Sequence, residues 1–263
     1  MELFYVDKGK VEEARGPLGY TMEQVVESGS GSTAIIYKCF KEGCTPKVIK
    51  RIAAKLKVDP WWKLLIQDQR VDFENGRLRD VDQTASLLLF HRTTDIGERL
   101  YLRAFASEKN VYYVTTMSGG QSFEMIREQL TARTTVHALT WMPESVAEVN
   151  AFAVHLNEGA DKTEQIAETL REWDSLVREH ENIKLRTYSS SPPMMYGVAV
   201  EDVWVHLELL TYKTDVNSRA ALLLHSDNDS QRQALRFFSG KMKELYRDGK
   251  KRVPGEMPTW YKK

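Results

Sequence analysis

The chain has 263 residues, of which 42% are hydrophobic and 28% are charged, which allows one large or two small globular domains with a sizeable core. No run of about 18 apolar residues occurs, and the first residues lack a basic segment and a cleavage site, so neither a membrane span nor a signal peptide is expected. The formal net charge is zero, which for the whole chain argues against a nucleic-acid-binding protein.

The charge is nevertheless unevenly distributed along the chain. Acidic residues dominate from Glu144 to Glu181, whereas residues 34–57 contain one acid, Glu42, and many bases. A local basic patch on a neutral chain predicts a DNA-contacting module joined to a neutral or acidic domain. The basic residues of this stretch are Lys38, Lys41, Lys47, Lys50, Arg51, Lys55 and Lys57.

Three short helices are predicted near the N-terminus, over residues 21–28, 33–43 and 46–56. Thr21 can cap the first helix, and the glycines at 29 and 31 break the chain after it. In the middle helix, Ile36 and Phe40 lie four residues apart, as expected for core positions. Gly43 ends that helix and Pro46 suits the first turn of the next one.

The two cysteines, Cys39 and Cys44, are too few for a disulfide framework and do not form a C-x-x-C pair. Cys39 falls at a core spacing, so we expect a small buried apolar residue there and not a reactive thiol. This cysteine usage fits a reducing, cytoplasmic setting, and the sequence implies no cofactor and no metal.

The run from Thr33 to Gly43, followed by Pro46, Ile52-Ala53, Leu56 and Val58-Asp59-Pro60, resembles the phage-repressor-like (Cro/C1, or XRE) helix-turn-helix family. The resemblance covers residues 18–66 and implies that the middle helix reads the major groove of DNA. A plain helical subdomain with solvated lysines is the alternative. The residues implied in DNA binding, with the neighbouring basic positions, are Thr33, Ala34, Ile35, Tyr37, Lys38, Lys41 and Lys47.

The remainder of the chain predicts a mixed α/β domain. We expect residues 1–66 to form a small all-α helix-turn-helix domain, 67–92 a polar connector, 93–250 the α/β domain and 251–263 a loose basic tail. Strands are predicted over 111–117, 135–141, 183–188, 195–200, 203–210 and 220–225, with helices over 123–130, 143–157, 161–181 and the stretch that begins at 230.

The segments 183–188, 194–202 and 205–207, with the strand and helix that follow, resemble one half of a phospholipase D-like fold. The match covers residues 93–248 and is closest to degenerate versions fused behind XRE domains in bacterial regulators. The active family requires H-x-K-x₄-D, and no histidine here is followed by lysine two residues later. We therefore expect no phosphodiesterase chemistry, and a structural role for His206.

The turn from Ser118 to Ser122 follows a predicted strand and opens a helix, where backbone amides can hold an anion. An ordinary tight turn is the alternative. The acid-rich helix 161–181 can likewise be a metal or partner surface or, more simply, a solvated face. The weak candidates for binding a small-molecule or anionic effector are Ser118, Gly119, Gly120, Ser122 and His206.

These patterns favour a sequence-specific transcriptional regulator that binds double-stranded DNA as a homodimer, with a ligand-sensing or dimerisation domain behind the reader. Two alternatives stay open. One is a phosphodiesterase or nucleotide-processing enzyme, which would need a convergent cluster such as His137, His206 and Glu208. The other is a protein-interaction module of the antitoxin or adaptor type.

Overall fold

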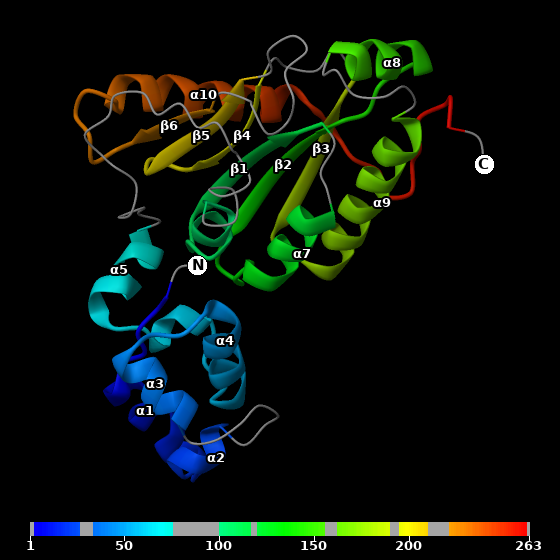
Figure 1. The fold of residues 1–263 in the computed structure, drawn as a ribbon. Coiled ribbons are helices and arrows are strands. Elements are labelled where there is room, and N and C mark those ends of the chain that lie inside the picture. The colour runs from blue at the N-terminus through cyan, green and yellow to red at the C-terminus, as the bar shows by residue number, and fades with distance from the viewer. Residues whose placement is uncertain are drawn as a thin grey trace. The chain divides into compact units, whose positions relative to one another are not determined.

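The computed structural model of the protein (Figure 1) describes residues 3–26, 34–75, 100–116, 120–155, 162–189, 195–209 and 221–261. The chain divides into two compact units, Met1–Asn75 and Gly76–Lys263. The two units are described separately below.

The N-terminal unit begins with an extended segment and not with a helix. Phe4 and Val6 are buried while the alternate residues Leu3 and Tyr5 are exposed, the period of two typical of extended chain. Phe4 bridges to Cys44, and Val6 bridges to Leu65. The prediction of an all-α unit is therefore wrong, because this extended segment lies antiparallel to the residues that it bridges.

Helix α1 (Lys8–Arg15) follows at once, in a stretch where we predicted no helix. The Asp7 side chain caps it by accepting hydrogen bonds from the amides of Gly9 and Lys10. A turn at η1 (Gly16–Leu18) and Gly19, which has positive φ, leads into α2 (Met22–Val26). Thr21 caps α2 as predicted: its Oγ1 accepts from the Gln24 amide, 3.2 Å away.

Helices α3 (Ala34–Lys41) and α4 (Pro46–Lys55) agree with two of the predicted helices. Gly43 sits between them with φ of 80°, a backbone conformation that L side chains rarely adopt. Ile36 on α3 and Ile49 and Ile52 on α4 supply buried side chains. Phe40, predicted to be a core residue, is only half-buried and packs edge-on against the exposed Tyr37.

The predicted connector starts inside a helix of the N-terminal unit. Residues Gln67–Asn75 form α5, and its Phe73 is fully buried among Phe4, Trp61 and Trp62, the last two from η2 (Trp61–Leu64). Aromatic pairs of this kind add stabilisation beyond the area that they bury. The weak periodicity of residues 67–75 hid this helix, because Phe73 alone carries most of its apolar contact.

The structure also corrects the prediction for the cysteines. Cys39 at the end of α3 and Cys44 before α4 form a disulfide, with their Cα atoms 4.9 Å apart. Both residues are buried, as predicted for Cys39. The turn at Gly43 brings the two side chains together, which their spacing in the sequence alone does not reveal.

The second unit is built on a mixed sheet. Its described strands are β1 (Asn110–Thr115), β2 (Thr135–Trp141), β3 (Ile183–Tyr188), β4 (Met195–Val200), β5 (Trp204–Leu209), β6 (Ala221–His225) and β7 (Lys250–Lys251), in the spatial order β6-β5-β4-β1-β2-β3-β7. β1, β2 and β3 are parallel, and the other pairings are antiparallel. All of the predicted strands are present, and β7 is additional.

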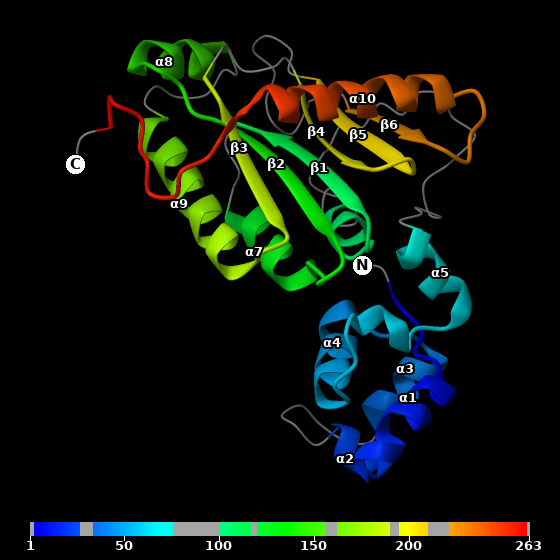
Figure 2. The same cartoon turned by 180° about the vertical axis from the view of Figure 1, so that it is seen from behind.

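Helices cover both faces of this sheet. α7 (Gly120–Gln129) and α9 (Thr163–Glu179) lie on one face, and α10 (Arg232–Asp248) lies on the other, as the opposite views in Figures 1 and 2 show. α8 (Val146–His155) packs beyond the end of β2, where Trp141, Val149 and Phe152 share an apolar cluster. Successive side chains of each strand point to opposite faces of the sheet, so the strands contribute to two cores, one on each face.

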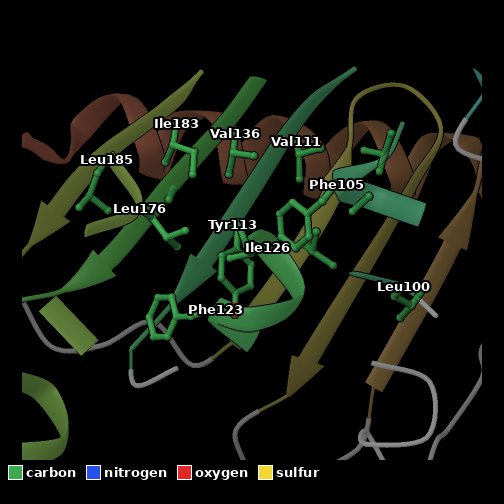
Figure 3. Close-up of a cluster of buried hydrophobic side chains, with 14 of the residues drawn as sticks. Leu100, Phe105, Val111, Tyr113, Phe123, Ile126, Val136, Leu176, Ile183 and Leu185 are labelled. Atoms are coloured by element: carbon green, nitrogen blue, oxygen red, sulfur yellow. The ribbon is translucent and has the colours of Figure 1, made fainter. Parts of the chain in front are cut away.

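The larger core lies between the sheet and α7 and α9. Val111, Val136 and Ile183 come from neighbouring parallel strands, and Phe123 and Leu176 of the two helices pack onto them (Figure 3). The core beneath α10 includes Val205, Leu224 and Met242. None of the helices in the described ranges has both the length and the hydropathy required to span a membrane.

The C-terminal tail, predicted to be loose, is packed against the α/β unit. Arg252 is buried and pairs with Asp174 of α9, and the Trp260 indole donates to the backbone oxygen of Pro143 at 2.8 Å. Tyr261 hydrogen-bonds to Glu164 of α9. The basic composition of residues 250–252 concealed this packing, because the partner of Arg252 lies far away in the sequence.

Candidate nucleic-acid interface

The candidate reading helix α3 is anchored by one face. Ile36 and Cys39 are completely buried, and the disulfide ties Cys39 to Cys44, whose amide and carbonyl both hydrogen-bond to Phe4. Helical spacing places these anchors on the side of α3 that faces the core. The helix is therefore held from its middle to its C-terminal end, which fixes the direction of its other face.

That other face is exposed and basic. Tyr37 has 48% of its surface exposed, and Lys38 and Lys41 are also exposed. Lys41 is a neighbour of both Tyr37 and Lys38 on the helix surface, because it follows them by four and three residues. The ammonium group of Lys38 lies 3.9 Å from the Glu42 carboxylate, an exposed pair that contributes little and leaves the lysine able to move to another anion.

Helix α4 also carries exposed cations. Lys47 is exposed in its first turn, and Arg51 is exposed one turn later. Lys55 lies with its ammonium group 5.5 Å from the centre of the Tyr20 ring, a cation–π distance. Pro46 opens the helix as predicted, and Thr45 before it makes no side-chain capping bond.

Three of the predicted DNA-binding residues have no exposed side chain that the structure describes. Thr33 lies outside the described residues, and Ala34 is placed only as the first residue of α3. Ile35 is half-buried, with its backbone oxygen 3.9 Å from the Cys44 sulfur. Of the predicted DNA-binding residues, those with exposed side chains are thus Tyr37, Lys38 and Lys41 on α3 and Lys47 on α4.

The weak effector candidates of the α/β unit are only partly described by the structure. Ser118 and Gly119 lie outside the described residues, and Gly120 opens α7. Ser122 lies on α7 beside Tyr101, whose pKa is raised well above its usual range, mainly by burial and further by Tyr113 and Glu208. The Ser122 hydroxyl acts in the opposite direction by hydrogen-bonding to Tyr101.

His206 lies in the middle of β5 between Val198 and Leu223, its neighbours on the two adjacent strands. Only 4% of its surface is exposed, and its Nε2 atom is buried without a hydrogen-bond partner. Burial lowers the pKa of His206 to about 4, so the ring is neutral at pH 7. The structure therefore places His206 in the core, where it fits the expected structural role.

The cluster considered for an enzyme is not assembled. His137 stacks on Tyr112 and packs against Tyr246 of α10, so it faces the α10 side of the sheet. His206 faces the opposite side, because its neighbours in β5, Val205 and Leu207, belong to the core beneath α10. Among the described residues, no group of three metal-ligating side chains is close enough to hold a metal ion.

The chain was also compared with known proteins. No protein-family model matches it, and no curated protein is significantly similar to it. Among solved structures, it is similar to Nuc, a phospholipase D family member from Salmonella typhimurium, with 12% identity and a TM-score of 0.37, over 59% of this chain and 90% of that one.

Two other solved structures show similar levels of likeness. TrmBL2, an archaeal chromatin protein described by its novel mode of DNA binding, is 10% identical with a TM-score of 0.39, over 91% of this chain and 80% of that one. Phosphatidylserine synthase of Haemophilus influenzae Rd KW20 is 12% identical with a TM-score of 0.38, over 78% and 47%. With TM-scores below 0.5, we base neither a family nor a function on these likenesses.

Proposed function

We propose that the protein is a sequence-specific DNA-binding transcriptional regulator in which α2 and α3 act as a helix-turn-helix pair. The observation that carries this proposal is the two-sidedness of α3. One side is locked into the core by Ile36 and Cys39, while the other presents Tyr37, Lys38 and Lys41 to solvent. A helix presented in this way can enter the major groove of duplex DNA.

The side chains of this face divide by chemistry. Lys41 and Lys47 carry exposed ammonium groups suited to phosphate oxygens. Lys38 can reach a phosphate or a guanine edge, and Tyr37, with its exposed ring, contacts base edges or thymine methyl groups. Thr33 and Ala34 precede these residues and belong to the same proposed contact.

In this proposal the α/β unit serves as a dimerisation or effector-sensing domain. A single small reader buries too little surface to select one site in a genome, so a second copy is needed. The two-fold symmetry of such a dimer predicts a palindromic operator. A small-molecule or anionic effector acting on the α/β unit would then alter DNA binding.

We also propose that the α/β unit does not hydrolyse phosphodiesters. The His–Lys pair that forms and stabilises the phospho-enzyme in the phospholipase D-like family has no counterpart in the sequence. Purified protein with bis(p-nitrophenyl) phosphate and with a nicked plasmid should release no more product than a buffer blank. Turnover that co-purifies with the protein and is lost in a His206→Gln variant would overturn this part of the proposal.

The main proposal is tested by selecting genomic fragments on purified full-length protein and measuring affinity for the selected duplex. Lys38→Glu with Lys41→Glu should lower that affinity at least a hundredfold at low salt. The matched control is Lys8→Glu with Lys10→Glu on α1, which makes the same change of charge in the same unit and should lower affinity less than threefold. Equal losses in both variants, or no enriched fragment, would overturn the proposal.

A further inference from the structure

Several exposed cations gather where β3 meets β7, in the described part of the α/β unit. We call this region the β3–β7 basic surface. In the antiparallel pairing of the two strands, Arg186 lies opposite Lys251 and Thr187 opposite Lys250. Lys184 lies two residues before Arg186 on the same face of β3. The exposed cations at this edge of the sheet are Lys184, Arg247, Lys250 and Lys251. Lys251 shares the face of Arg186 and Lys184, and Lys250 projects from the same edge on the opposite face.

The end of α10 is fastened to this surface through Arg186. Its Nη1 atom donates to the backbone oxygens of Arg247 and Gly249, at 2.5 and 3.0 Å, and its guanidinium lies 5.0 Å from the centre of the Tyr246 ring. Gly249 permits this close approach, because a Cβ atom there would lie 2.6 Å from Leu139. The backbone that carries Arg247, Lys250 and Lys251 is therefore held against β3.

Three cations of this surface, Lys184, Lys250 and Lys251, form no ion pair with any residue that the structure describes. Arg247 lies 4.0 Å from the carboxylate of Asp248. Two other cations of α10 are paired, Lys241 with Glu244 and Lys243 with Glu201. The positive charge of this surface is therefore carried mainly by the lysines of β3 and β7.

The positive field reaches the adjacent part of the sheet. The pKa of His137 is lowered first by burial and then by Lys184, with further contributions from Arg186 and Lys243. Lysines on an edge strand can also serve only to prevent pairing with another sheet, which would account for Lys250 and Lys251. β7 pairs only with Arg186 and Thr187 of β3, so Lys184 also lies at the edge of the sheet. An edge of this kind can serve both roles, because its lysines stay exposed to solvent.

We infer that the β3–β7 basic surface binds the phosphodiester backbone of duplex DNA without regard to sequence. The inference rests on the proposed function, to which it adds a second set of phosphate contacts in the α/β unit. Exposed lysines on a rigid edge match a row of phosphates by charge, and each phosphate neutralised releases a counterion. Such contacts would raise the affinity for any duplex and leave the choice of site to α3.

The test uses full-length protein and two fluorescent duplexes, the selected sequence and a scrambled one, titrated between about 50 and 200 mM salt. The variant Lys184→Gln, Lys250→Gln, Lys251→Gln should bind both duplexes at least tenfold more weakly at low salt. The slope of log affinity against log salt should shrink by roughly 2 to 3 units, as expected for three lost phosphate contacts. Unchanged affinity and slope would overturn the inference.

The matched control is Arg133→Gln, Arg171→Gln, Arg178→Gln, which removes the same number of charges from the α9 side of the unit and should leave the slope unchanged. Unaltered circular dichroism and thermal midpoints would show that both triple variants are folded. An equal loss in the control would also overturn the inference, because only net charge would then matter. Binding to phosphatidylglycerol vesicles with no binding to either duplex would also overturn the inference.

The Lys38→Glu, Lys41→Glu variant separates this inference from the proposed function. If it loses the preference for the selected duplex but keeps salt-steep binding to the scrambled one, both are supported. If wild-type protein shows no preference between the duplexes while the β3–β7 variant flattens the slope, the inference stands and the sequence-specific function falls. No binding to either duplex at the lowest salt would overturn both.

Discussion

Arg252 and Asp174 form a two-point ion pair inside the α/β unit. Nε and Nη2 of Arg252 lie 3.0 and 2.9 Å from the two carboxylate oxygens of Asp174, and the side chains are 1% and 3% exposed. The same carboxylate accepts from the Gly255 amide at 2.8 Å. The residue pair thus fastens the C-terminal tail to α9 through a fully desolvated contact.

Removing one partner of this pair should be costly. Asp174→Ala leaves a buried guanidinium without its counter-charge, and we expect a loss of about 3–5 kcal/mol in the free energy of unfolding. Urea denaturation followed by far-ultraviolet circular dichroism measures this loss. The double variant Asp174→Ala, Arg252→Met should recover part of it, because the uncompensated charge is then gone.

The matched control is the exposed pair between Arg171 and Glu164, which also joins charged groups on α9 at 2.8 Å. Arg171→Ala should cost less than about 1 kcal/mol, since exposed pairs are screened by solvent. If Asp174→Ala proved no more destabilising than Arg171→Ala, the tail would not be fastened as the structure has it.

The disulfide between Cys39 and Cys44 should stabilise the N-terminal unit. By the loop-entropy relation, closing so short a loop raises the free energy of unfolding by about 2 kcal/mol. Differential scanning calorimetry with and without dithiothreitol should therefore show a lower midpoint in the reductant. The Cys39→Ala, Cys44→Ala variant should show no response to dithiothreitol, and two free thiols in the oxidised wild-type protein would contradict the prediction.

Much of the α/β unit is readable from the sequence because its elements are local patterns. The β-branched and aromatic runs at 111–117 and 183–188 predict strands close to the observed β1 and β3. Helix α1 was missed although Asp7 offers a cap, because Lys8–Arg15 buries only Val11 and has little apolar periodicity. The buried position of Phe73 was missed because its helix, α5, also has little apolar periodicity.

What the sequence could not supply depends on contacts between distant residues. Lys250-Lys-Arg252 reads as a solvated run until Asp174 and the partner strand β3 are placed beside it. The β3–β7 basic surface likewise requires the register between Arg186 and Lys251. The exposed face of α3 was predictable, because Tyr37, Lys38 and Lys41 are separated from Ile36 and Cys39 by helical geometry alone.

His206 should make the α/β unit less stable in acid. Its pKa is lowered by burial from 6.5 to about 4, so between these values the unfolded chain binds a proton that the folded chain does not. The stability that this difference supplies is present at pH 7 and is lost as the pH falls from 6.5 toward 4. The loss from His206 at pH 4.5 should be roughly 2–3 kcal/mol.

The measurement is urea denaturation of wild type and His206→Leu at pH 7 and pH 4.5. The variant should lose less stability on acidification, because leucine binds no proton and fits between Val198 and Leu223. His225, whose pKa burial also lowers, retains its own contribution in both proteins. An equal acid sensitivity of the two proteins would show that His206 titrates normally.

Two glycines of the α/β unit should respond in opposite directions to alanine. At Gly197 on β4, a Cβ atom would lie 2.5 Å from the backbone oxygen of His206 and 2.7 Å from Leu207, so the paired strands must separate. We expect Gly197→Ala to cost about 1–3 kcal/mol in the free energy of unfolding.

At Gly240 in α10 nothing lies within 4 Å of the added atom, and alanine favours the helix. Gly240→Ala should therefore stabilise the protein by about 0.5–1 kcal/mol. Thermal and urea denaturation of the two variants measure both changes, and a tolerated Gly197→Ala would mean that β4 and β5 do not approach as closely as the structure shows.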